Sequence, residues 1–589
     1  MNVVKLSLPL FACAALGLAH AQDAQRPTGF PGTPVGHVPR VEIPWNRFYD
    51  TPELYALFDK LESTYPTLLR HEVIGKSIED REMRVYVLND PATGKDTEKP
   101  AMWIDGNVHG NEVQAGEAVL YTLWYLLENR ETTPEIGKLV AGSAFYLCPT
   151  QNPDGRAHWF ERAHDSSSSR TGVRPWDDDR DGRADEDPAN DLDGDGMITQ
   201  MRKYVPGHGT HRQDPDDPRL LTPVPPNDEG RKGDWVMLGE EGVDDDGDGR
   251  LNEDEVGGYD MNRAWPSMWE PDHVQFGAGP YPLYWPEARS IAQFVLAHPN
   301  IAALQSFHNA GGMILRGPGA EPYGEYERED VRVFDELGKT GEKMLPFYRY
   351  MVIWKDLYTV YGGFATWGYE GLGIISFTNE LWNSDQQWGD GANKPDPKER
   401  WFFDDKLLRG EGFVDWHPYE HPFYGAVEIG GWRKDVGRVP PTFMIEEMLH
   451  RNAMFDVEHA AAMPLVRIGD VVVTDLGEGL STVDVVFQNL HAIPTRTAQA
   501  ARKKIGEPDS FTITGRDVEV LAGGFRTDRW RPERIELAER EPARLLRESG
   551  IGSRGEVRVR WFVRGKGDRA TVSWQGEKAR DQSLEIKLR

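Results

Sequence analysis

The sequence predicts an α/β domain, with a mixed and mostly parallel sheet flanked by helices, followed by a small β-sandwich. Short apolar runs alternate with stretches of helical periodicity up to about residue 464, which is the pattern of βα units. From residue 465 onward the pattern changes to short alternating strands separated by turn residues, which is typical of a sandwich. We therefore expect one domain over residues 45–464 and a second over 465–589.

Two segments precede the first domain. Lys5 is followed by an apolar run from Leu6 to Leu18 and by Ala19-His20-Ala21, the composition of a secretory signal peptide over residues 1–21. The apolar run is too short to span a bilayer comfortably. Residues 22–44 are rich in Pro and Gly and are expected to form an extended leader. We therefore expect a secreted protein, periplasmic or extracellular, without a membrane span.

The elements follow from apolar periodicity and from the residues that bound it. Thr51-Pro52 opens a helix, and Val113 begins a second one whose apolar residues recur at helical spacing. Further helices are expected at 287–296 and 444–463. Strands of the α/β domain are expected at 81–88, 101–104, 144–148, 301–307 and 373–377. Strands of the sandwich are expected at 466–474, 481–487, 518–521, 557–563 and 570–574. In such α/β sheets, sites collect at the carboxyl ends of the strands.

Composition limits the class of partner. The 589 residues carry a formal net charge of -29, which disfavours binding to nucleic acid and to anionic membranes. Of two cysteines, Cys13 would leave with the signal peptide, and Cys148 lies in an apolar segment. We expect a buried free thiol and no intrachain disulfide. The sequence does not decide the oligomeric state.

Residues 157–258 interrupt the α/β pattern with a polar stretch rich in Pro, Gly and Asp. A compact domain seldom carries so long an irregular loop without something to order it. Three Asp-x-Asp-x-Asp-Gly runs offer an explanation, because alternate carboxylates around a Gly turn are calcium ligands. Only the third run is followed by an acid, Glu255, at the last position of the calcium-loop pattern. Calcium at the other two runs would therefore need further ligands. A solvated acidic loop is the alternative. The candidate calcium ligands are Asp177, Asp179, Asp181, Asp191, Asp193, Asp195, Asp244, Asp246, Asp248 and Glu255.

One stretch carries a candidate metal pair. His109 and Glu112 lie between the strand ending at Ile104 and the helix from Val113. Residues three apart at a helix start share one face, so both can reach one ion, and a hydrolytic zinc takes three such ligands plus water. Three other histidine motifs are read as non-metal sites: His158 with Glu161, His417 with Glu420 in a loop, and His208 with His211 in a loop.

Further motifs follow in order along the chain. They are Asn152-Pro-Asp-Gly155, Asp260-Met-Asn262-Arg263, Gln305-Ser-Phe-His308-Asn, Tyr358-Thr-Val-Tyr361-Gly-Gly363 and Ser376-Phe-Thr-Asn-Glu380. With His109 and Glu112, this series resembles the zinc carboxypeptidase family, the carboxypeptidase A-type metallopeptidases, over roughly residues 45–463. The resemblance implies a carboxypeptidase A-like fold and a secreted, bacterial-type enzyme that acts on the C-termini of peptides or proteins.

The resemblance also implies residue roles. His109, Glu112 and His308 match the zinc ligands, and Glu380 matches the general base that activates the zinc-bound water. Asn262 and Arg263 match the pair that grips the substrate's terminal carboxylate. Tyr358 matches the tyrosine that closes over that carboxylate, with Tyr361 as its rival. Arg170 is the candidate for the arginine that stabilises the oxyanion, with Arg174 as runner-up.

General chemistry supports these roles. Zinc lowers the pKa of water, a carboxylate can carry the proton, and arginine binds carboxylates in bidentate fashion. The family's side-chain pocket aligns with Ala365, beside Phe364 and Thr366, which favours an uncharged substrate side chain. Two alternatives stay open. One is a zinc amidase or peptidase acting on cell-wall peptides, and the other is a non-catalytic, calcium-dependent binding protein.

Overall fold

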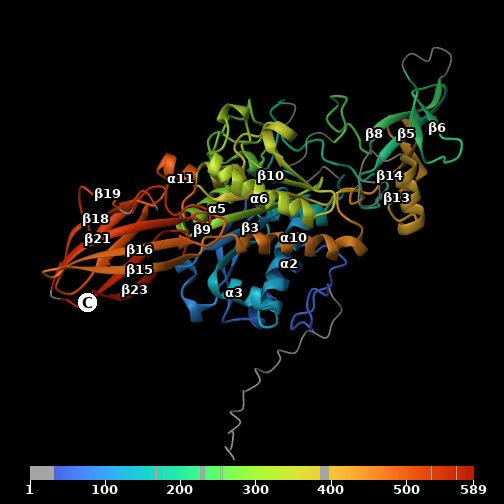
Figure 1. The fold of residues 1–589 in the computed structure, drawn as a ribbon. Helices are drawn as coiled ribbons and strands as arrows, with labels where there is room; N and C mark the ends of the chain where they lie inside the picture. Colours follow the sequence, from blue (N-terminus) through green and yellow to red (C-terminus); the bar gives the residue numbers. More distant parts are fainter. Residues whose placement is uncertain are drawn as a thin grey trace, which may run out of the picture.

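The computed structural model describes residues 32–165, 170–177, 180–225, 232–252, 254, 257–384, 397–528, 530–531, 533–565 and 567–588. Its centre is an eight-stranded sheet in the order β1-β2-β4-β3-β9-β12-β10-β11 (Figure 1). Strands β4, β3, β9 and β12 run parallel to one another, and antiparallel pairings flank them on both sides. The predicted mixed sheet is confirmed. The strands are β1 (Leu69–Lys76), β2 (Glu82–Leu88), β3 (Ala101–Gly106), β4 (Ala144–Cys148), β9 (Ile301–Asn309), β10 (Met313–Arg316), β11 (Arg349–Val352) and β12 (Ile375–Leu381).

Helices cover both faces of this sheet. Strand β3 is buried throughout, with Met102 and Ile104 in one core and Trp103 in the other, as expected for alternating side chains. The first core also contains side chains of α1, α2, α6 and α10, and the second contains side chains of α5 and α7. The helices are α1 (Thr51–Thr64), α2 (Gln114–Asn129), α3 (Pro134–Gly142), α4 (Pro153–Glu161), α5 (Pro286–Ala297), α6 (Arg328–Met344), α7 (Phe364–Glu370) and α10 (Ile445–Ala461).

The leader prediction covers residues 22–44, of which 32–44 are described. This part has no helix or strand and packs on α2, where Trp124 Nε1 donates a hydrogen bond to the Val41 carbonyl at 2.8 Å. The predicted signal peptide lies outside the described residues.

The prediction of an irregular loop over 157–258 is wrong in one respect. Part of that stretch forms β5, β6, β7 and β8, which join β13 and β14 in a second sheet, ordered β13-β14-β5-β8-β6-β7 (right side of Figure 1). His208, His211 and His417 therefore lie on strands rather than in loops. Pro418 is compatible with β13 because an edge strand tolerates a residue without an N–H. The elements are β5 (Gln200–Gly209), β6 (His211–Gln213), β7 (Leu221–Pro223), β8 (Gly233–Glu240), α9 (Pro397–Phe403), β13 (Phe413–His421) and β14 (Gly425–Trp432).

The C-terminal region is an antiparallel β-sandwich (red and orange in Figure 1). A five-stranded sheet, β15-β16-β21-β18-β19, packs on a four-stranded sheet, β20-β17-β22-β23, over a shared core that includes Trp561 and Trp574. The elements are β15 (Val466–Gly477), β16 (Leu480–Asn489), α11 (Ala498–Lys503), β17 (Asp509–Thr514), β18 (Val518–Arg526), β19 (Ile535–Leu537), β20 (Arg544–Arg547), β21 (Glu556–Gly565), β22 (Arg569–Gln575) and β23 (Gln582–Lys587). Within the described ranges, no helix is both long and apolar enough to cross a membrane.

Candidate active site

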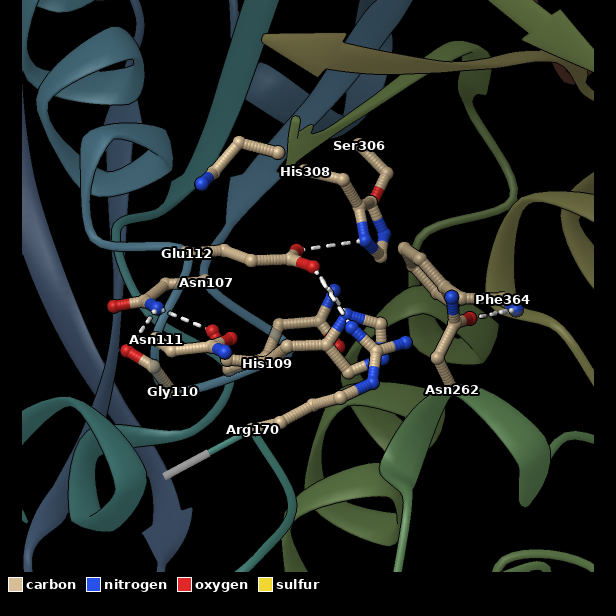
Figure 2. Close-up of polar contacts among 12 residues, drawn as sticks. Asn107, His109, Gly110, Asn111, Glu112, Arg170, Asn262, Ser306, His308 and Phe364 are labelled. Atoms are coloured by element: carbon tan, nitrogen blue, oxygen red, sulfur yellow. Dashed lines mark hydrogen bonds and ion pairs between the residues drawn. The ribbon is translucent and has the colours of Figure 1, made fainter. Parts of the chain in front are cut away.

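The loop between β3 and α2 presents His109 and Glu112. Asn107 starts the turn with a φ of 58°, a left-handed conformation that Asn adopts more readily than most residues. Its Nδ2 donates to the carbonyls of His109 and Gly110 at 2.6 and 3.1 Å, and its Oδ1 accepts from buried Arg156 at 3.0 Å. The loop shape is thus fixed by side-chain hydrogen bonds, and Figure 2 shows the two that Asn107 donates within the loop.

His109, Glu112 and His308 form a buried triad of potential metal ligands. One ligand atom from each lies within 4.8 Å of the others. His109 Nδ1 is 2.9 Å from Glu112 Oε1, and His308 Nδ1 is 3.0 Å from Glu112 Oε2 (Figure 2). Two imidazoles and one carboxylate are a donor set that hydrolytic zinc uses, with its ligands at about 2.0–2.2 Å. The residues therefore fit zinc.

The electrostatics of the triad suit a cation. Burial raises the pKa of Glu112, but the two neighbouring imidazoles outweigh it and hold that pKa well below its ordinary value. Asp260 lies behind His109, with Oδ1 3.1 Å from Nε2. Such a carboxylate orients a ligand imidazole and leaves Nδ1, the nitrogen facing Glu112, for the metal.

Glu380 lies beside the triad because β12 runs parallel to β9 and pairs Glu380 with His308. The carboxyl-terminal ends of strands β9 and β12 therefore lie at the same edge of the sheet. Burial raises the pKa of Glu380, and the nearby Glu112 carboxylate raises it further. A carboxylate with a raised pKa holds an accepted proton more readily, which suits a general base that must pass a proton on.

Of the two arginines considered for oxyanion stabilisation, only Arg170 lies in the cavity lining. Arg170 lies in the pocket, where its NH1 group is 3.1 Å from Glu112 Oε1 (Figure 2). Arg174 lies outside the pocket lining, with its guanidinium 4.9 Å from the centre of the Trp285 ring and 5.1 Å from that of Trp176. Arg170 is therefore positioned for chemistry, and Arg174 stabilises a packed aromatic cluster.

The candidate carboxylate clamp lines the same cavity of about 310 Å³. Asn262 Oδ1 accepts from the backbone N–H of Phe364 at 2.9 Å (Figure 2), so its amide N–H groups remain available as donors. Arg263 is 3.8 Å from Asp260. Tyr358 lines the cavity and is half exposed, whereas Tyr361 is outside the lining. Tyr358 is therefore the better placed of the two tyrosines.

Apolar side chains form much of the cavity wall, including Leu315, Ile353, Val360 and the predicted Ala365. The lining also contains Arg438, which the sequence interpretation missed because the residue stands more than fifty positions after Glu380 and in no recognised motif.

The acidic insertion gathers two groups of carboxylates. Asp191 and Asp193 lie with Glu241, and Asp244 and Asp246 lie with Asp187. The buried Glu241 and Asp187 were not predicted, and both come from segments distant in sequence from their runs. Within the described part of the insertion, four predicted ligands fall in neither group: Asp177, Asp181, Asp195 and Asp248. Asp179 and Glu255 lie outside the described residues.

Comparison with known families agrees with this geometry. The model for zinc carboxypeptidase matches residues 54–195 and 234–401, together more than half of the chain. The chain belongs to the zinc carboxypeptidase family. The predicted family is confirmed. A domain of unknown function matches residues 465–587, over the sandwich.

Similarity of this zinc carboxypeptidase family member to individual proteins is partial. It is 32% identical over 138 residues to carboxypeptidase D of Mus musculus, covering 23% of this chain and 10% of that one. It is 33% identical over 130 residues to carboxypeptidase B of Astacus astacus, covering 22% and 41%. The structure of thrombin activatable fibrinolysis inhibitor shares 16% identity at a TM-score of 0.43, covering 71% of this chain and 74% of that one. The matched segment thus spans only a tenth of carboxypeptidase D.

Proposed function

We propose that this protein is a zinc metallocarboxypeptidase that removes the C-terminal residue of peptides or proteins. The observation that carries the proposal is the convergence of a three-ligand set, a carboxylate base and an arginine–asparagine pair in one cavity. His109, Glu112 and His308 would hold the zinc. When bound, zinc would supply a Lewis acid for the scissile carbonyl and would lower the pKa of water.

The protein's own residues account for the remaining chemistry. Glu380 accepts the proton of the attacking water and delivers it to the leaving amine. Arg170 stabilises the negative charge that develops on the carbonyl oxygen. Arg263 and Asn262 bind the terminal carboxylate, which restricts cleavage to the last peptide bond, and Tyr358 covers that end of the cavity. The apolar wall around Leu315 and Val360 favours an uncharged C-terminal side chain.

The test compares the full-length protein with Glu380→Gln. Zinc per chain is measured, together with amino-acid release from a panel of peptides with different C-terminal residues. We expect the protein to release single C-terminal residues. In the variant the rate of release should fall about 10²–10⁴-fold, while the zinc content should be unchanged. Zinc without release from any peptide would favour the amidase or cell-wall peptidase. Absence of zinc would favour the non-catalytic binding protein.

We also propose that the insertion binds calcium. The proposal is supported by two groups, each combining acidic residues of one Asp run with a buried carboxylate from another segment, Glu241 or Asp187. Oxygen donors of this kind suit calcium. Calcium should raise the temperature of unfolding, and Glu241→Gln should reduce that rise. An equal rise in both proteins would contradict the Glu241 assignment.

We also propose that the protein is secreted, and this proposal rests only on the sequence of residues 1–21. Cleavage after Ala21 would make Gln22 the mature N-terminus. N-terminal sequencing of protein recovered from periplasm and medium tests this, and an intact Met1 would contradict it.

A further inference from the structure

The cavity contains a third arginine whose position lies outside the family match. Arg170, Arg263 and Arg438 all line the cavity, but the match to the zinc carboxypeptidase model ends at residue 401. Arg438 comes from the loop between β14 and the short 3₁₀ helix Thr442–Met444. Arg438 therefore adds a third guanidinium to the cavity from a segment beyond that match.

The loop holds Arg438 in place by contacts on both sides. The Asn309 side chain, next to the candidate ligand His308, donates to the Arg438 carbonyl at 3.2 Å. Val439 is buried against Val113 and Trp159, and Lys434 donates to the Trp159 carbonyl at 2.7 Å. These contacts hold the backbone at Arg438 in place, so the loop itself need not be ordered when a ligand binds.

The Arg438 side chain is only partly engaged by the protein. Its NH2 group donates to Asn111 Oδ1 at 3.1 Å and is 3.6 Å from Glu112 Oε1. Its Nε is buried with no hydrogen-bond acceptor among the described residues. The side chain is 23% exposed. Arg438 thus retains donor capacity at the cavity surface.

The position of Arg438 suggests which part of a substrate it meets. The terminal carboxylate is assigned to Asn262 and Arg263, whereas the polar contacts of the Arg438 side chain are with Asn111 and Glu112. When the clamp holds the last residue of a substrate and the scissile bond lies at the ligands, the preceding residue lies near the ligand set, where Arg438 lines the same cavity 3.6 Å from Glu112.

We infer that Arg438 is a specificity-determining residue that binds the carboxylate of an acidic residue immediately before the scissile bond. The inference rests on the proposed carboxypeptidase function. A guanidinium and a carboxylate form charge-assisted hydrogen bonds that are stronger than those of a neutral amide. Peptides with Glu at the penultimate position should therefore be preferred over peptides with Gln there.

The test uses zinc-loaded full-length protein and peptides that share one C-terminal residue and differ only in a penultimate Glu, Gln or Lys. We expect kcat/KM to be about tenfold higher for Glu than for Gln. Arg438→Gln should bring the ratio of kcat/KM for the Glu peptide to that for the Gln peptide close to one, and Arg438→Lys should retain part of that ratio. Arg433→Gln is the matched control, since it removes the same charge from the same loop outside the cavity lining, and it should keep the full ratio.

A second readout separates binding from turnover. Glu380→Gln protein should bind the Glu peptide about tenfold more tightly than the Gln peptide in calorimetry, and adding Arg438→Gln should abolish the difference. Cleavage with no preference for Glu would overturn the inference and leave the proposed function standing, whereas no cleavage of any peptide would overturn the function itself. Loss of zinc in Arg438→Gln would also overturn the inference, because Arg438 would then act on Glu112.

Discussion

Asp330 connects the sandwich to the wall of the cavity. Its removal should lower the free energy of unfolding and weaken substrate binding. The residue lies in the first turn of α6 and is 1% exposed. Its Oδ1 accepts from the backbone N–H of Ala498 at 3.0 Å, and its Oδ2 accepts from that of Gln499 at 3.0 Å. Oδ2 also accepts from the Tyr369 hydroxyl on α7 at 2.8 Å. One carboxylate therefore joins α6, α7 and α11.

The expected magnitude follows from these three donors. Asp330→Ala leaves two N–H groups and one hydroxyl without their acceptor, and each buried unsatisfied group costs about 1–3 kcal/mol. Burial raises the pKa of Asp330, so desolvation of the carboxylate already offsets part of its benefit. We therefore expect a loss near the lower end, about 3 kcal/mol in the free energy of unfolding. Asp330→Asn keeps one acceptor and should lose about half as much.

Urea unfolding followed by tryptophan fluorescence measures the loss, with Glu329→Ala as control. Glu329 is an exposed carboxylate in the same helical turn, so its removal should cost at most about 0.5 kcal/mol. Because α7 supplies Phe364 and Ala365 to the cavity, Asp330→Ala should also raise KM severalfold without changing zinc content. A loss below 1 kcal/mol, or a loss equal to that of the control, would refute this account of the contact.

Three further predictions concern the site and the insertion. Arg170→Ala should lower kcat by about 10²–10³, whereas Arg174→Ala should lower the unfolding temperature with kcat retained; equal losses of kcat would contradict the assignment. Asn107→Ala should weaken zinc affinity about tenfold in competition with a chelator, because it removes the hydrogen bonds that shape the ligand loop; unchanged affinity would argue against that role. Burial raises the pKa of Glu241 to about 7, and calcium requires the ionised form, so the calcium-induced rise in unfolding temperature should shrink between pH 8 and pH 6. A rise that does not depend on pH would contradict this coupling.

The site could be predicted from the sequence where its residues lie at strand ends or in compact motifs. His109, Glu112, His308 and Glu380 each follow or end a short apolar run, and parallel strands bring such ends together. Arg438 could not be predicted, because a loop reaches the cavity through contacts with α4 that no local pattern encodes. Glu241 was missed for a similar reason, since its carboxylate joins the run at Asp191 only through the fold of the insertion.

Hydrogen bonds within the insertion explain how so long a segment can leave the site intact. An early segment of the insertion is hydrogen-bonded to the segment where it ends: Gly172 N–H donates to the Tyr259 carbonyl at 2.9 Å, and Gly257 N–H donates to the Arg174 carbonyl at 2.7 Å. The approach is so close that a Cβ at Gly172 would lie 1.7 Å from the Tyr259 ring. Arg170 lies just before this closure and Asp260 just after it. The chain between these hydrogen bonds can therefore form its own strands and carboxylate groups while Arg170 and Asp260, which flank the bonds, keep their places around the ligand set.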